Sequence, residues 1–142
     1  MLRSVKVSAF MATRPVVASP NMTVFEAAKL TMQNKISGLP VVDETGKLVG
    51  MLSELDCLRV LLDSVYNDQE YGAQRVSDVM TTEVDVCHPE DDIVDVAASM
   101  LNNRHRRRPV VEDGKLVGQL TCRQILRAVR EFTGVHDPAE QP

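Results

Sequence analysis

The sequence contains two copies of one pattern, and this duplication constrains the fold more than any other feature. Residues 7–59 align with residues 76–127 with one gap at Thr45, and both copies contain the run GKLVG. Met11 aligns with Met80, which sets the copies about 69 residues apart. Two copies indicate a duplicated module, because a solenoid array needs at least three repeats.

Each copy is too small to be stable by itself, since about 52 residues can bury only a limited share of their surface. We therefore expect the copies to pack face to face about a pseudo-twofold axis and to share a core. Such packing creates two equivalent clefts, and small molecules usually bind in clefts between units. The predicted organisation is repeat one at 7–62, a connector at 63–75, repeat two at 76–131 and a frayed tail at 132–142.

The hydrophobic periodicity of each copy predicts the element order β-α-β-β-α, and hence an α/β fold. Asp113 and Gly114 form a strong two-residue turn signal inside the second hairpin. The expected elements are strands at 15–18 and 84–87, helices beginning at Thr23 and Asp92, hairpins at 39–52 and 109–120, and second helices beginning at Ser53 and Thr121.

Composition excludes several classes of protein. With 44% hydrophobic and 25% charged residues, the chain is typical of soluble globular domains and unlike disordered chains. It has no apolar run of the roughly 18 residues that a membrane span needs. The first ten residues lack a secretory signal, so we expect a cytoplasmic protein.

The charged and metal-binding residue types give no strong motif of their own. A net charge of −4 argues against a general nucleic-acid binder. The three cysteines and three histidines are scattered without a CxxC pair, so we expect no metal site. No nucleophile, base and orienting group are visible together, and we do not expect an enzyme.

The order of three motifs resembles a tandem pair of CBS domains (a Bateman module), named after cystathionine β-synthase. These are residues 37–43 (SGLPVVD), 50–56 (GMLSELD) and 77–81 (SDVMT), within a match covering residues 7 to about 131. The resemblance implies a regulatory, non-catalytic module that often forms homodimers. It also implies binding of an adenosine compound, namely AMP, ADP, ATP, NAD or S-adenosylmethionine.

The local chemistry at Ser53 and Asp56 supports that implication. Bare N–H groups and the positive end of a helix that begins here would favour a phosphate, and the Asp56 carboxylate suits the paired hydroxyls of a ribose. The alternative interpretation is a helix cap, which uses the same residue types. In the second copy Thr121 and Gln124 keep the capping pattern, but glutamine is a poorer ribose ligand.

The basic run at residues 104–108 (RHRRR) is the other candidate site, either as a phosphate clamp or as a solvated basic loop. By resemblance, one cleft combines the intact acidic residue with these cations: Met51, Ser53, Asp56, Thr81, Val84, Arg106 and Arg107. The second cleft, which we expect to be weak, altered or empty, contains Ala12, Pro15, Val16, Ser37, Gly38, Thr121 and Gln124.

Two other functions remain open at this stage. An interaction or dimerisation module with degenerate clefts would keep the duplication without using Asp56 or the arginines for a small molecule. An arginine-rich nucleic-acid binder would use residues 104–108, although no aromatic residue lies near that run. Without an attached effector domain, a regulatory module would act on a separate protein.

Overall fold

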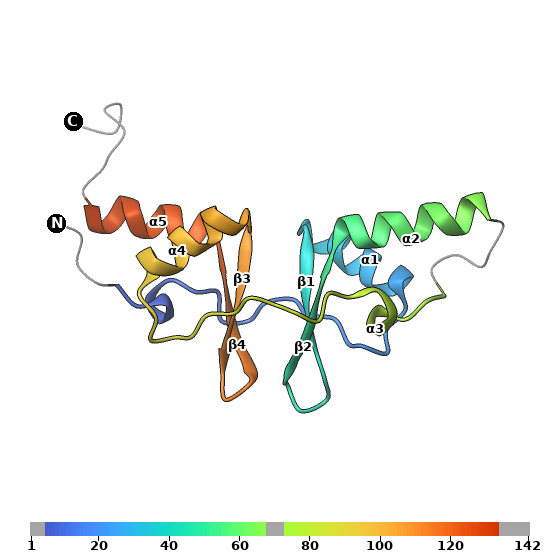
Figure 1. Cartoon of the computed structure of the whole chain (residues 1–142), viewed down its shortest axis with the longest axis horizontal. Helices are drawn as coiled ribbons and strands as arrows, with labels where there is room; N and C mark the ends of the chain where they lie inside the picture. The colour runs from blue at the N-terminus through green and yellow to red at the C-terminus, as the bar shows by residue number, and fades with distance from the viewer. Residues whose placement is uncertain (1–4, 68–72, 134–142) are drawn as a thin grey trace. The chain divides into compact units, whose positions relative to one another are not determined.

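The computed structural model describes residues 5–67 and 73–133, which form two compact units (Figure 1). The β1–β2 unit consists of residues 15–84 and 114–116, and the β3–β4 unit contains the remaining described residues. Helices and strands occur in both units, so the α/β expectation is confirmed. The centre of the expected connector and most of the expected tail lie outside the described residues.

The β1–β2 unit is a two-stranded antiparallel hairpin with helices packed on it. In the ladder Leu39 lies opposite Leu52, and a bulge falls between Val41 and Val42. Its elements are α1 (Val24–Asn34), β1 (Gly38–Val42), β2 (Leu48–Ser53), α2 (Glu54–Tyr66) and α3 (Val76–Val79).

The β3–β4 unit repeats the plan with a tighter hairpin. Asp113 and Gly114 have φ values of 53° and 78°, as the predicted two-residue turn requires. The elements of this copy are η1 (Val7–Ala9), α4 (Ile93–Asn103), β3 (Arg107–Glu112), β4 (Lys115–Thr121) and α5 (Cys122–Thr133). Residues 115 and 116, at the start of β4, are grouped with the other unit.

Local side-chain caps explain where the first helix of each copy begins. The Thr23 hydroxyl accepts a hydrogen bond from the Glu26 N–H (3.1 Å), and Asp92 accepts one from the Val94 N–H (2.9 Å). Both predicted helix starts are thus confirmed. The two helices also end alike, since Lys35 and Arg104 adopt the left-handed conformation as C-caps.

The prediction of strands at 15–18 and 84–87 is wrong. Each segment forms a single parallel bridge, from Ala18 to Val41 and from Cys87 to Val110. Two backbone hydrogen bonds flank each bridge, but Pro20 follows the first within two residues and has no N–H to continue a ladder. In the second segment, Pro89 lies two residues after Cys87 and likewise has no N–H to continue a ladder.

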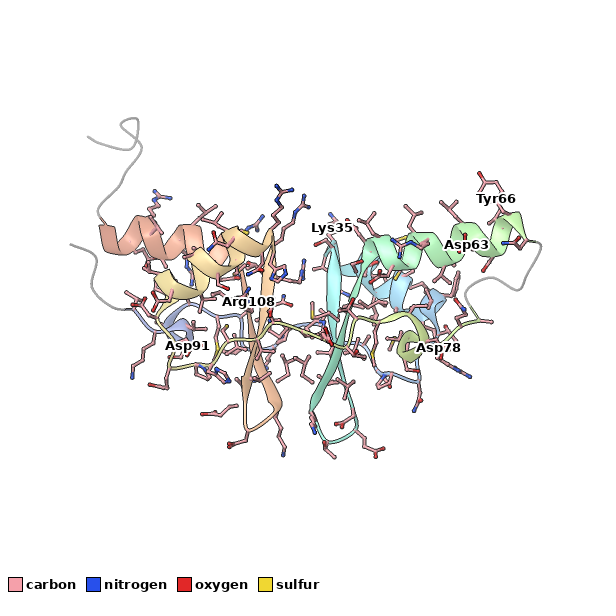
Figure 2. All side chains as sticks on the ribbon, in the orientation of Figure 1. Lys35, Asp63, Tyr66, Asp78, Asp91 and Arg108 are labelled. Atoms are coloured by element: carbon pink, nitrogen blue, oxygen red, sulfur yellow. The ribbon has the colours of Figure 1, made fainter. Side chains whose placement is uncertain are left out.

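The short helices η1 and α3 were not predicted, and they show how the copies exchange their leading segments. The Val7 N–H donates to the Asp91 carbonyl (2.9 Å), so the start of copy one packs within the β3–β4 unit. The Val76 N–H donates to the Met22 carbonyl (2.8 Å), so the start of copy two packs within the β1–β2 unit. Asp78 of α3 is labelled in Figure 2.

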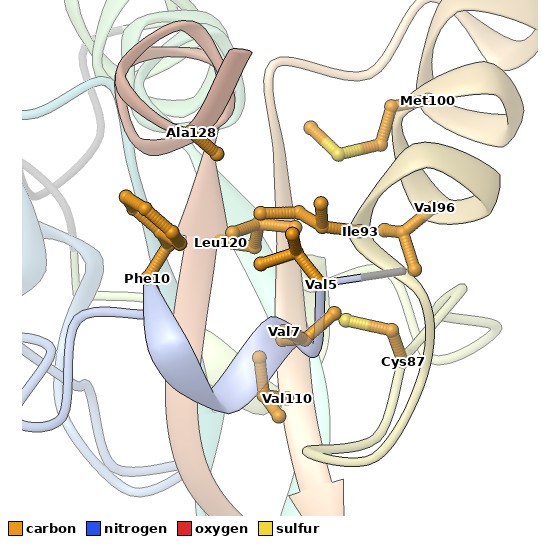
Figure 3. Close-up of a cluster of buried hydrophobic side chains, with 10 residues drawn as sticks. All are labelled: Val5, Val7, Phe10, Cys87, Ile93, Val96, Met100, Val110, Leu120 and Ala128. Carbon is orange, nitrogen blue, oxygen red and sulfur yellow. The ribbon is translucent and has the colours of Figure 1, made fainter. Parts of the chain in front are cut away.

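Each unit has its own apolar core, to which both copies contribute. In the β3–β4 unit, Val5, Val7 and Phe10 from the beginning of the chain join Ile93 and Leu120 (Figure 3). In the β1–β2 unit, Val76 from copy two belongs to the cluster built mainly by copy one. Burial of these leading segments is the physical reason that neither unit coincides with one sequence repeat.

Candidate functional site

The junction of β2 and α2 places Ser53 and Asp56 in a reciprocal arrangement. The Asp56 N–H donates to Ser53 Oγ (3.1 Å), and the Ser53 N–H donates to Asp56 Oδ2 (2.9 Å). This capping box confirms the predicted helix start. The cap occupies one carboxylate oxygen of Asp56. The other, Oδ1, lies 3.7 Å from Nη1 of the largely exposed Arg59, a contact that contributes little.

Two of the first N–H groups of α2 already have partners, so the helix end is less bare than expected. The Glu54 N–H donates to the Ser37 carbonyl (2.8 Å), and the Asp56 N–H is taken by Ser53. The carboxylates of Glu54 and Asp56 also lie in the first turn, where they repel an anion. The junction therefore suits a group with hydroxyl donors, such as a ribose, better than it suits a phosphate.

Thr81 from copy two lies beside this junction. Met51 and Thr81 exchange two backbone hydrogen bonds, each 2.9 Å long. Their approach depends on Gly50, because a Cβ there would lie 2.6 Å from Met80 Sδ and 2.9 Å from the Thr81 carbonyl oxygen. Thr81 is exposed, and Met51, Ser53 and Asp56 are half-buried. The structure thus brings together four residues of the first predicted cleft.

The β1–β2 unit also contains five further residues of the two predicted clefts. Gly38 pairs with Ser53 in the hairpin, so Ser37 and Gly38 lie next to the residues of the first cleft, although the sequence assigned them to the second. The other predicted residues of this unit are half-buried and lie outside its helices and strands: Pro15, Val16 and Val84. Val16 packs against the apolar core of this unit.

The β3–β4 unit contains the equivalent junction in altered form. Ala12 and Gln119 exchange two backbone hydrogen bonds of 2.9 Å, as Met51 and Thr81 do in the other unit. The Thr121 N–H donates to Gln124 Oε1 (2.7 Å), and the Thr121 hydroxyl also contacts that oxygen. The only side-chain acceptor of Gln124 is therefore used locally, which leaves the amide nitrogen for other partners.

Gln119 is a residue that the sequence reasoning missed. Its side chain is buried, and within the described part of the chain Oε1 has no hydrogen-bond partner. Buried acceptors normally have a donor, so this oxygen is a candidate contact for a bound group. The alignment could have identified it, because Gln119 occupies the position that Met51 has in copy one.

The basic run divides into exposed and buried members. Arg104 and Arg106 are exposed, Arg107 is half-buried and Arg108 is 4% exposed. The interpretation as a solvated loop is therefore wrong for Arg108. The Cys122 N–H donates to the Arg106 carbonyl (3.2 Å), which ties the run to the start of α5.

Arg108 is held by the side chains of Ser99 and His105. Nη1 donates to Ser99 Oγ (2.8 Å), Nη2 lies 3.1 Å from His105 Nδ1, and Nε is buried without a partner in the described residues. Burial raises the pKa of the nearby Cys87 thiol to about 11, with Asp91 adding to the shift and Arg108 opposing it. Sequence reasoning did not identify Ser99, His105 or Arg108 as a cluster.

Asp56 belongs to the β1–β2 unit, whereas Arg106 and Arg107 belong to the β3–β4 unit. Their predicted convergence on one ligand stays a prediction. Within the described ranges, no three acidic, histidine or cysteine side chains cluster as a metal site would require. None of the helices in those ranges combines the length and apolar character needed to cross a membrane.

Comparison with known proteins identifies the repeated pattern. The model of the CBS domain matches residues 7–63 and again residues 76–131. The CBS domain-containing protein CBSX1, chloroplastic, of Arabidopsis thaliana is 33% identical, and the match covers 82% of this chain. This chain spans only 59% of the length of CBSX1.

Solved structures show the same fold. The structure of Arabidopsis thaliana CBSX2 in complex with AMP is 34% identical, with a TM-score of 0.79 and coverage of 90% of this chain and 98% of that one. The CBS domain pair of protein MJ0100, in complex with 5′-methylthioadenosine and S-adenosyl-L-methionine, is 28% identical, with a TM-score of 0.74 and coverage of 93% and 98%. The chain belongs to the CBS domain family and carries two CBS repeats.

Proposed function

We propose that this protein is a regulatory module that binds an adenosine compound and has no catalytic activity of its own. The observation that carries the proposal is the β2–α2 junction, where Met51, Ser53, Asp56 and Thr81 lie together. Relatives with the same fold are described in complex with AMP, 5′-methylthioadenosine and S-adenosyl-L-methionine, which supports an adenosine ligand here.

In the proposed site the ribose hydroxyls donate to Asp56. One oxygen of Asp56 already caps α2, which holds the carboxylate in a fixed orientation and leaves Oδ1 as the acceptor. We further propose that Arg106 and Arg107 bind the phosphate groups when the ligand carries them, because an arginine fork matches phosphate geometry. The candidate ligands are AMP, ADP, ATP, NAD and S-adenosylmethionine.

Isothermal titration calorimetry with AMP, ATP, NAD and S-adenosylmethionine tests the proposal. We expect at least one dissociation constant below about 1 mM, corresponding to about 4 kcal/mol or more of binding free energy. If none of these compounds binds in that range, the proposed function is wrong.

Substitution of Asp56 then tests the site. Asp56→Asn keeps an oxygen that can accept the Ser53 N–H, so the cap survives while the charge is lost. Binding should weaken roughly 10- to 100-fold, because a hydrogen bond to a charged group contributes about 1.5–3 kcal/mol. Asp63→Asn is the matched control, since Asp63 is an exposed residue farther along α2 (Figure 2). Equal affinity of the two variants would place the ligand elsewhere.

We also propose that the protein forms a homodimer through exposed apolar side chains of its helices. Met32 of α1 and its counterpart Leu101 of α4 are 69% and 80% exposed, and Leu58 and Leu126 repeat this relation on α2 and α5. The same apolar face is thus present in both copies, so a second molecule offers a matching surface. Sedimentation equilibrium should give twice the monomer mass, and Leu58→Glu should shift the population toward the monomer.

An interaction module with unused clefts is the alternative function, favoured by the same apolar faces. It predicts a stable dimer whose melting temperature is unchanged by any of the nucleotides. A nucleic-acid interface at residues 104–108 is less well supported, because Arg108 is buried and the chain carries a net charge of −4.

A further inference from the structure

Arg108 is a buried cation without a neighbouring anion. It is labelled in Figure 2 on β3, and the residue is 4% exposed. Across the described residues, no carboxylate oxygen lies within salt-bridge distance of its guanidinium group, whose contacts are Ser99 Oγ and His105 Nδ1. Oδ2 of Asp85, whose side chain is 62% exposed, lies 3.8 Å from His105 Nδ1, the same ring nitrogen that Arg108 Nη2 approaches.

A charge in this position costs free energy, because burial removes water that the hydrogen bonds to Ser99 and His105 replace only in part. Nε of Arg108 is buried and has no partner among the described atoms, so even its hydrogen-bonding capacity is incompletely satisfied. Unsatisfied polar groups of this kind concentrate at functional sites, where the cost is offset by another interaction.

The duplicated copy shows that the fold does not require a cation here. Pro109 aligns with Pro40, so the counterpart of Arg108 is Leu39, which is 0% exposed in the core of the β1–β2 unit. An apolar side chain therefore fits the equivalent strand position. Replacing a buried ionic group by an apolar one is often neutral or stabilising, so stability does not explain Arg108.

We propose that Arg108 makes the module selective for anionic adenosine compounds, the nucleoside phosphates, over the neutral 5′-methylthioadenosine and the cationic S-adenosylmethionine. This inference rests on the proposed function. Arg108 acts as a positioning residue: its contacts with Ser99 and His105 link α4 to the segment that presents Arg106 and Arg107. Its uncompensated charge adds to their positive potential, and low-dielectric surroundings screen that charge weakly.

The experiment compares AMP with 5′-methylthioadenosine, which share the adenosine part and differ at the 5′ group. Calorimetry is done at low ionic strength on the full chain and on Arg108→Met, Arg108→Leu and Arg108→Lys. Methionine keeps an unbranched side chain of similar length, and leucine is the residue at this position in the other copy. With two uncharged variants, the test still works if one of them fails to fold. Lys29→Gln, which removes an exposed cation from α1, controls for net charge.

We expect Arg108→Met and Arg108→Leu to weaken AMP binding about tenfold or more and to leave 5′-methylthioadenosine binding within about twofold. Arg108→Lys should restore part of the AMP affinity, because it returns the charge without the planar fork. Lys29→Gln should resemble the unmodified chain.

The inference is overturned if Arg108→Met binds AMP as tightly as the unmodified chain, or if it loses both compounds equally. The first result leaves the proposed function standing, whereas the second makes Arg108 a structural residue only. If the unmodified chain binds neither compound nor any other adenosine compound, the proposed function and this inference both fail.

Discussion

Single residues at the candidate site serve local structure and ligand chemistry at once. Ser53 and Asp56 form the cap of α2, and the same carboxylate is the proposed ribose acceptor. The sequence predicted the cap, which is confirmed, because it depends on residues only three positions apart; the ribose contact stays a prediction. Sequence reasoning missed the cluster of Ser99, His105 and Arg108, because a basic run carries no local sign of which arginine is buried.

The capping role of Ser53 can be measured by itself. Ser53→Ala removes the acceptor of the Asp56 N–H and should lower the free energy of unfolding by about 1 kcal/mol. Urea unfolding followed by circular dichroism gives the change. Ser53→Thr keeps a hydroxyl acceptor and should remain within about 0.5 kcal/mol of the unmodified chain. Equal stabilities of the alanine and threonine variants would show that the cap does not stabilise α2.

The three cysteines should react with an alkylating reagent at different rates. Burial raises the pKa of the Cys87 thiol to about 11 and also raises that of Cys57, whereas Cys122 is exposed. The thiolate is the nucleophile, so iodoacetamide at pH 8 should modify Cys122 first. Peptide mass spectrometry over time gives the order, and modification of Cys87 before Cys122 would contradict it.

The same shift predicts a loss of stability at alkaline pH. Because the folded-state pKa of Cys87 lies above its ordinary value of 9.0, the thiol stabilises the fold fully below about pH 9. That contribution is lost as the pH rises through about 11. The melting temperature of the unmodified chain should therefore fall more between these pH values than that of Cys87→Ala, and parallel curves would contradict the assignment.

At the scale of elements, periodicity and turn signals predicted the four main helices and both hairpins. Those features depend on side chains close in sequence, such as Thr23 with Glu26 and the pair Asp113 and Gly114. The strands predicted at 15–18 and 84–87 are single bridges instead. Whether an extended segment becomes a strand depends on partners elsewhere in the chain, which local patterns do not specify.

Gly50 controls how the leading segment of copy two meets β2. Gly50→Ala should displace Met80 and Thr81, lower stability by about 1–3 kcal/mol and weaken adenosine-compound binding. Calorimetry and urea unfolding give both quantities. Gly46→Ala is the control, because its φ of 87° strains alanine but no atom lies within 4 Å of the new Cβ. The control should lose stability and keep binding, and loss of binding by both variants would refute the assignment.

At the scale of the whole molecule, each unit depends on residues from both copies. Phe10 lies at the beginning of the chain, yet its ring packs in the core of the β3–β4 unit (Figure 3). The Arg127 guanidinium lies over this ring, 5.3 Å from its centroid. The sequence predicted one core shared by copies packed face to face, whereas the described residues form two core clusters, one in each unit. The sequence did not predict that the leading segments of the copies are exchanged between the two units.

Phe10→Ala tests this exchange. Loss of the buried ring should cost about 3–5 kcal/mol. Hydrogen exchange followed by mass spectrometry should show lost protection in α4 and α5, with β1 and β2 protected as before. A rise in exchange confined to β1 and β2 would show that Phe10 supports the unit formed mainly by its own copy.

The sequence by itself determined the duplication, the helices with their caps, the hairpins and the CBS family, because these follow from local spacing and from the likeness of the two copies. Only the tertiary structure decided which unit receives each leading segment and which arginine is buried. The physical reason is that the copies offer similar apolar surfaces: Val7 and Val76 are both fully buried, and Gly50 and Gly118 each admit a close backbone neighbour. The choice between such near-equivalent partners depends on packing across the folded chain.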